Sequence, residues 1–104
     1  MEKKIYISGK MTGLSKEEID NNFNKGVREV KKLGFIPVNP NDIPAYFMNG
    51  KNDNPTYEEW IRGDLIELCK CHAIYMLRNW QDSTGAKIEM RVAIDLNMEI
   101  LFQS

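Results

Sequence analysis

Two acidic residues sit where the helical periodicity of the chain calls for apolar side chains, and they are the first candidates for chemistry. Asp64 follows Tyr57 by seven residues and Ile61 by three. It also precedes Leu68 by four residues, which places it inside the apolar stripe of a predicted helix. A carboxylate at such a position is costly unless another group pairs with it. The structural alternative is a boundary residue that reaches solvent or Arg62.

Glu89 repeats this pattern on the last predicted helix, where it shares a face with Ala86, Ala93 and Leu96. The small neighbours leave room for a ligand. Its place near the start of the helix favours an ionised carboxylate, because the positive end of the helix dipole lies there, and so favours a nucleophilic or acceptor role. An acid that merely complements the dipole is the alternative. Two such acids beside the crevice expected at the carboxyl ends of the predicted strands favour a functional site.

Other groups of the right chemistry lie near the ends of predicted strands. Tyr6 stands between Ile5 and Ile7, so it faces the other side of its strand and its hydroxyl can reach the crevice if that side carries the last helix. A buried tyrosine bonded to backbone is the alternative. Trp80 follows the third strand and either stacks on a base or covers the end of the sheet.

The turn after the first strand offers backbone N–H groups to an anion, or allows a sugar to approach closely. It consists of Gly9, Lys10, Met11, Thr12 and Gly13. It matches neither a Walker loop nor the G-x-G-x-x-G motif.

Seven alternating elements must position these residues. Short runs of β-branched and apolar residues predict strands at residues 3–8, 35–38, 72–77 and 98–102. Capping boxes at Ser15 with Glu18 and at Thr56 with Glu59 predict the first two helices, Gly34 ends the first, and a third is expected over residues 84–97.

This alternation predicts an α/β fold with a three-layer, flavodoxin-like or Rossmann-like parallel sheet, strand order 2-1-3-4, and helices on both faces. Ligands bind such sheets at the carboxyl ends of the strands beside the switch point between the first and third strands. The loops at residues 9–13 and 78–84 should therefore face each other across one crevice.

Residues 39–55 form the longest irregular segment, which is typical of a lid or binding loop. Tyr46 and Phe47 within it suit an interface equally well. Apolar loop residues of this kind predict a homodimer or higher homo-oligomer.

Length and composition exclude several classes. The 104 residues predict one domain, residues 1–104, and 42% hydrophobic with 28% charged residues is ordinary for a globular protein. Fourteen basic against fifteen acidic residues disfavour a nucleic-acid polymer as partner. The chain contains no apolar run long enough to cross a membrane, so we expect a cytoplasmic protein. Cys69, Cys71 and His72 are three potential metal ligands, but the sequence has no second cluster of ligands to complete a tetrahedral site. We therefore expect reduced, largely buried cysteines and no metal.

Several ordered motifs together resemble the nucleoside 2-deoxyribosyltransferase superfamily, in particular a small branch typical of bacteria and phages, over nearly the whole chain. They are Tyr6-Ile7-Ser8-Gly9 with Met11-Thr12-Gly13, the helix carrying Asp64-Leu65, Cys71-His72-Ala73-Ile74, and Asp82-Ser83-Thr84-Gly85-Ala86 leading to Glu89.

The resemblance implies that Glu89 attacks the anomeric carbon, that Tyr6 positions its carboxylate, and that Asp64 contacts the sugar or the base near the departing nitrogen. It implies retaining glycosyl chemistry without a cofactor. Catalytic residues are thus expected to be Glu89, Asp64 and Tyr6. The expected substrate-binding residues are Ser8, Gly9, Lys10, Met11, Thr12, Gly13, Trp80, Asp82 and Ser83.

Two departures from the family pattern bear on the substrate. Nucleoside-transferring relatives have an aspartate six residues before the nucleophile, where this chain has Ser83 and where relatives that hydrolyse nucleoside 5′-monophosphates have a serine. Ser83, Lys10 and Thr12 are thus candidates for holding a phosphate. The chain also ends after its fourth predicted strand, without the segment through which transferase relatives complete a neighbour's site.

The leading hypothesis is therefore a nucleoside or nucleotide N-glycosyl enzyme, either a 2-deoxyribosyltransferase or an N-glycosidase. The alternatives are a non-catalytic module that binds a nucleotide-derived small ligand, and a purely structural interaction domain.

Overall fold

The computed structural model describes residues 2–42 and 56–104, and within them the predicted fold class is confirmed. Four parallel strands form one sheet in the order β2-β1-β3-β4. They are β1 (Lys4–Ser8), β2 (Ile36–Val38), β3 (Ala73–Met76) and β4 (Glu99–Phe102). The helices between them are α1 (Lys16–Lys32), α2 (Tyr57–Cys69) and α3 (Thr84–Asp95). Each observed strand lies within its predicted range.

The two predicted capping boxes are confirmed and fix the starts of α1 and α2. The Ser15 hydroxyl accepts from the Glu18 N–H at 3.1 Å, and the Glu18 carboxylate accepts from the Ser15 N–H at 3.1 Å. Thr56 and Glu59 exchange the same pair of hydrogen bonds at the start of α2. Each box satisfies two backbone donors that a helix start leaves without partners.

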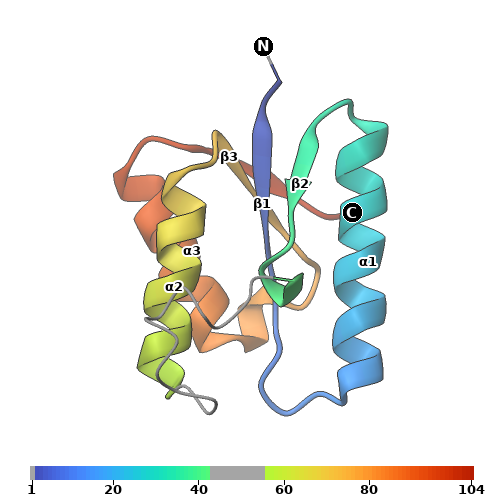
Figure 1. Ribbon diagram of the computed structural model, residues 1–104, viewed down its shortest axis with the longest axis vertical. Coiled ribbons are helices and arrows are strands. Elements are labelled where there is room, and N and C mark those ends of the chain that lie inside the picture. The colour runs from blue at the N-terminus through green and yellow to red at the C-terminus, as the bar shows by residue number, and fades with distance from the viewer. Residues whose placement is uncertain (1, 43–55) are drawn as a thin grey trace.

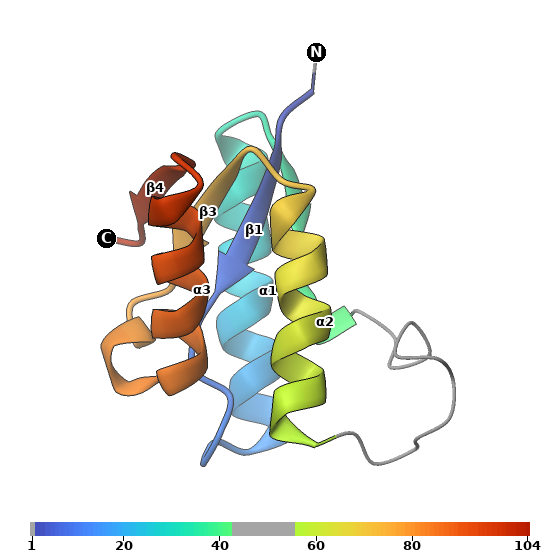
Figure 2. The same cartoon turned by 90° about the vertical axis from the view of Figure 1, so that its left-hand side faces the viewer.

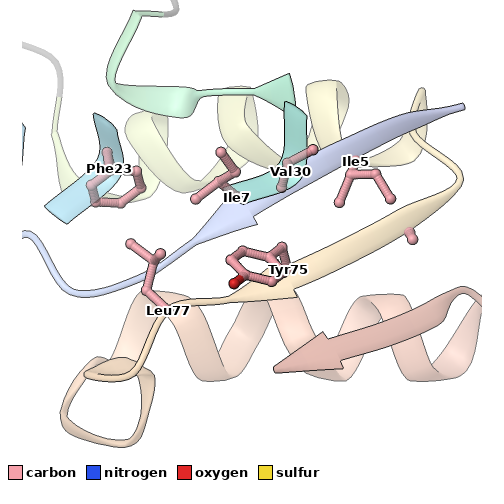
Figure 3. Close-up of a cluster of buried hydrophobic side chains, with 7 residues drawn as sticks. Ile5, Ile7, Phe23, Val30, Tyr75 and Leu77 are labelled. Carbon is pink, nitrogen blue, oxygen red and sulfur yellow. The ribbon is translucent and has the colours of Figure 1, made fainter. Parts of the chain in front are cut away.

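The sheet is covered by α1 on one face and by α2 and α3 on the other (Figures 1 and 2). Because side chains alternate along a strand, Ile5 and Ile7 pack towards α1, where they meet Phe23 and Val30 (Figure 3). Tyr6 points the other way and packs in the cluster formed with α2 and α3. The alternation of side chains along β1 thus decides which of its residues can contact α3.

The apolar residues that end α1 and α3 are exposed. Leu33 and Leu96 are the C-caps of α1 and α3, and they are 55% and 53% exposed. The prediction that Leu96 shares the buried face of Glu89 is therefore wrong, because α3 ends at Asp95 before the stripe is complete.

The prediction that both cysteines are buried is wrong for Cys69, which is exposed at the last position of α2. Cys71 is half-buried, and its thiol donates to the Glu67 carbonyl at 3.3 Å. Burial raises the pKa of the Cys71 thiol to about 11, so it is a neutral, unreactive thiol at neutral pH. Residues 2–42 and 56–104 contain no cluster of three metal-ligating side chains.

The described residues do not test the expected interface loop or the expected homo-oligomer. Tyr46 and Phe47, and most of the irregular segment at residues 39–55, lie outside the described residues. Exposed apolar side chains do occur in the described part, among them Ile66 on α2, Ile94 on α3 and Phe102 on β4. A homo-oligomer stays a prediction. None of the described helices has the length and apolar character that a bilayer crossing requires.

We expect Ser15→Ala to lower the free energy of unfolding by about 1 kcal/mol, because it removes the side-chain acceptor of the first capping box. Urea denaturation followed by circular dichroism measures this. Ser15→Asp keeps an acceptor and should unfold close to the wild-type midpoint. Equal midpoints for Ser15→Ala and wild type would show that the cap contributes nothing.

Candidate active site

Glu89 is the buried centre of the site. Its side chain is only 4% exposed. The Tyr6 hydroxyl donates to Glu89 Oε2 at 2.8 Å, and the Ser8 hydroxyl donates to Glu89 Oε1 at 2.6 Å. Each carboxylate oxygen therefore has a donor from β1, which partly replaces the water that the carboxylate loses on burial.

Tyr6 and Ser8 can both reach Glu89 because they stand two residues apart on β1 and so face the same side of the sheet. Both are fully buried, and α3 crosses that side. The sequence singled out Ser8 as a substrate-binding residue, whereas its hydroxyl is held by the candidate nucleophile. The two-residue spacing between Tyr6 and Ser8 was the signal that could have revealed this contact.

Asp64 completes the cluster from α2. Its carboxyl group interacts with Glu89 through charge and a side-chain hydrogen bond, and its Oδ1 atom is buried without a hydrogen-bond partner in the described part of the chain. Burial, followed by the nearby charge of Glu89, raises the pKa of Asp64 from 3.8 to about 8. Asp64 is therefore largely protonated at neutral pH.

Burial also raises the pKa of Glu89, although the hydrogen bonds from Ser8, Tyr6 and Asp64 act in the opposite direction. This differs from the sequence-based expectation that the helix dipole favours the ionised form. Glu89 is the sixth residue of α3, whereas the dipole acts mainly within the first turn. The pKa values of both acids are therefore raised, and the pair titrates as a unit that retains a proton at neutral pH.

The same burial and the adjoining carboxyl groups raise the pKa of Tyr6 well above 10.0, with desolvation the largest cause. Tyr6 is thus a permanent hydrogen-bond donor to Glu89 rather than a base.

A cavity of about 700 Å³ opens in front of the two acids, within the size range of small-molecule sites. It lies at the carboxyl ends of β1 and β3, where the loops after these strands meet. The Lys10 N–H donates to the Asn79 side chain at 3.0 Å and joins the two loops. Of the residues singled out by the sequence, those lining the cavity are Gly9, Met11, Thr12, Asp64, Asp82, Ser83 and Glu89.

Four of the expected substrate-binding residues are not among the described residues that line this cavity, and one of them is Ser8, whose hydroxyl donates to Glu89. Trp80 packs on Phe102, with ring centroids 5.9 Å apart, so it covers the end of the sheet, as the alternative interpretation held. Lys10 contributes its backbone to the loop contact described above. Gly13 is exposed and has a φ of 87°, a value that favours glycine, so its role in the structure is to shape the turn.

The sequence missed the wall that α2 gives to the cavity. Tyr57 and Ile61 belong to the predicted apolar stripe, yet together with Trp60 they line the cavity, and Tyr57 and Trp60 are 45% and 39% exposed. Asp64 continues the same face of the helix. An acid within an aromatic stripe was the available signal that this stripe faces a site rather than the core.

Ser83 has a structural role as well as a place in the cavity. Its hydroxyl accepts from the Ala86 N–H at 3.0 Å and caps the start of α3. The first residues of the helix, Thr84 and Gly85, line the cavity beside it. The positive end of the α3 dipole therefore faces the cavity.

The described residues form an α/β domain with a 2-deoxyribosyltransferase-like fold. A solved structure of the 2-deoxyribosyltransferase from Bacillus psychrosaccharolyticus, described as a biocatalyst for the synthesis of antiviral and antitumoral nucleosides, matches with a TM-score of 0.67. Sequence identity is 16%, and the match covers 95% of this chain and 70% of that one. The model of the family described as "Domain of unknown function (DUF4406)" matches residues 3–102, so the chain belongs to that family. No curated protein matches the chain significantly.

The raised pKa of Asp64 predicts a pH-dependent cost to stability. The folded protein keeps a proton that the unfolded chain releases above pH 3.8, so stability falls as the pH rises from 3.8 through about 8. Asp64→Asn places a neutral amide beside Glu89 and has no proton to lose. We expect this variant to lose less stability than wild type across that window and to be the more stable protein at alkaline pH.

Urea unfolding at a series of pH values measures this difference. Asp95→Asn is the matched control, because Asp95 is exposed on α3 and forms an exposed ion pair with Arg91 at 3.4 Å. It should retain the wild-type slope. Parallel pH profiles for Asp64→Asn and wild type would contradict the assignment of the raised pKa.

Proposed function

We propose that this protein is a nucleoside or nucleotide N-glycosyl enzyme in which Glu89 is the nucleophile. The observation that carries the proposal is the pairing of Glu89 with the protonated Asp64 at the wall of a cavity of about 700 Å³. An ionised carboxylate beside a carboxylic acid is the pair of groups that retaining glycosyl chemistry requires. The 2-deoxyribosyltransferase-like fold supports the same class of reaction.

In the first step, a Glu89 carboxylate oxygen attacks the anomeric carbon and forms a glycosyl ester. The bond from that carbon to the base nitrogen breaks, and its electron pair goes to the nitrogen. Asp64 donates its proton to the leaving base, which departs neutral. The pKa of about 8 suits this role, because the acid is still protonated at neutral pH yet releases its proton readily.

In the second step, Asp64 acts in the reverse direction. As a carboxylate it takes a proton from water or from an incoming base while that molecule attacks the anomeric carbon. The ester bond breaks and Glu89 regains its charge. Two displacements at the same carbon retain its configuration. Water as acceptor makes the protein an N-glycosidase, and a second base makes it a deoxyribosyltransferase.

Tyr6 and Ser8 prepare the nucleophile. Their hydrogen bonds fix the plane of the Glu89 carboxylate and lower its pKa, which opposes the larger effect of burial. These bonds also stabilise the carboxylate as a leaving group in the second step. Both donors come from the central strand β1, which restricts their movement.

The start of α3 supports a substrate with an anionic 5′ substituent. Ser83, Thr84 and Gly85 line the cavity at the positive end of the helix dipole, and Thr12 faces them from the first loop. We therefore include deoxynucleoside 5′-monophosphates beside deoxynucleosides as substrates to be tested.

We expect Glu89→Gln to lower the rate of base release from these substrates by about 10³-fold or more, because the glycosyl ester can no longer form. Chromatographic detection of the free base measures the rate. Asp95→Asn on the same helix should keep wild-type activity. Saturable ligand binding without any product by wild type would favour the non-catalytic binding module, and equal turnover by Glu89→Gln would reject the nucleophile.

The rate of base release should also report the proton on Asp64. We expect kcat to fall as the pH rises above about 8, because Asp64 then lacks the proton that the leaving base needs. Asp64→Asn should be slower by roughly 10²- to 10⁴-fold at neutral pH and should show no alkaline decline of this origin. A wild-type rate that stays level through that pH range would exclude Asp64 as the acid.

A further inference from the structure

The cavity has one aromatic wall for which the proposed reaction has so far assigned no role. Tyr57, Trp60 and Ile61 face the cavity from α2, and they lie within two turns before Asp64 on the same face of the helix. A large apolar wall in an open cavity is unfavourable in water unless an apolar ligand covers it. Its chemistry fits a flat, weakly polar group better than a sugar or a phosphate.

Part of this wall is braced against α3. A Cβ atom on Gly85 would lie 3.1 Å from Ile61 Cδ1 and 3.4 Å from the Tyr57 hydroxyl, so both side chains already touch the first turn of α3. Gly85 allows this approach because it has no side chain. Tyr57 and Ile61 therefore form the part of the wall next to α3. Trp60 is the largest side chain in the rest of the wall.

The positions of the two acids decide which part of a substrate meets this wall. The anomeric carbon must reach Glu89, and the departing nitrogen must reach Asp64. Trp60 precedes Asp64 by four residues, which is about one helical turn or roughly 6 Å along α2. A base whose nitrogen contacts Asp64 therefore extends towards Trp60, while the sugar lies on the side of α3 and β1.

We propose that Trp60 stacks on the planar face of the leaving base and so acts as a specificity-determining residue of this site. This inference rests on the proposed function for the position of the sugar. The cavity then selects aromatic heterocycles as leaving groups, and it binds purines more tightly than pyrimidines because the stacked area is larger. The Oδ1 atom of Asp64, which has no hydrogen-bond partner among the described residues, accepts a hydrogen bond from the edge of the same base.

The chain offers a direct optical test, because its only tryptophans are Trp60 and Trp80. Trp80 packs on Phe102 and is not among the cavity-lining residues, so Trp80→Phe leaves Trp60 as the sole tryptophan in a protein with an intact wall. Titration with free adenine should quench the fluorescence of Trp80→Phe saturably. The matched variant Trp60→Phe retains only Trp80 and should show no saturable quenching.

Calorimetric titration with free adenine measures the contribution to affinity. We expect Trp60→Leu to raise Kd roughly 10- to 100-fold and Trp60→Phe to raise it less, because a smaller ring still stacks. Binding of 2-deoxyribose 5-phosphate should not change in either variant. Ile66→Ala is the control on α2, because Ile66 is exposed and does not line the cavity.

The outcomes separate this inference from the proposed reaction. Quenching of Trp60 with loss of adenine affinity in Trp60→Leu supports stacking even if wild type releases no base. Normal base release by wild type with an unchanged KM in Trp60→Leu leaves the reaction standing and overturns the stacking. Failure of wild type to bind free adenine, or quenching that persists in Trp60→Phe, also overturns it.

Discussion

The structure depends on the burial of one carboxylate, that of Glu89, beneath α3 and against the central strand of the sheet. An unpaired carboxylate at 4% exposure would be prohibitively costly, and the neighbouring groups offset this cost. Tyr6 and Ser8 each donate to one of its oxygens, and Asp64 adds a hydrogen bond from the neighbouring helix α2. Tyr6 and Ser8 come from β1, Asp64 from α2 and Glu89 from α3. The cluster therefore holds the sheet and the two helices on this face in one arrangement.

The topology makes this cluster possible. In the order β2-β1-β3-β4, strand β1 lies in the middle of the sheet, with its carboxyl end beside that of β3. The loop after β1 and the loop leading into α3 therefore meet over the same edge, and the Lys10–Asn79 hydrogen bond joins them. The helices α2 and α3 lie on the face to which Tyr6 points (Figure 2). The cavity forms where these elements diverge.

The second acid, Asp64, is held in a protonation state that costs stability at alkaline pH. Burial and the charge of Glu89 raise the pKa of Asp64 to about 8, so Asp64 is largely a carboxylic acid at neutral pH. Two neighbouring acids whose environments separate their pKa values are the usual origin of distinct acid and nucleophile roles. The same face of α2 supplies the aromatic wall of the cavity, so Asp64 and this wall come from one helix.

The sequence by itself determined the elements and their order, because capping boxes, glycine at the first helix end and apolar runs are local signals that act within a few residues. It also singled out Asp64 and Glu89, since an acid within an apolar stripe conflicts with its own neighbourhood. Only the tertiary structure decided that Ser8 holds Glu89, that Trp80 covers the sheet, and that Tyr57 and Trp60 face a cavity. These outcomes depend on which face of a helix meets another element, and periodicity shows that a stripe exists without showing what lies opposite. The protonation of the acids likewise follows from their shared burial, which only the packing of α2, α3 and β1 creates.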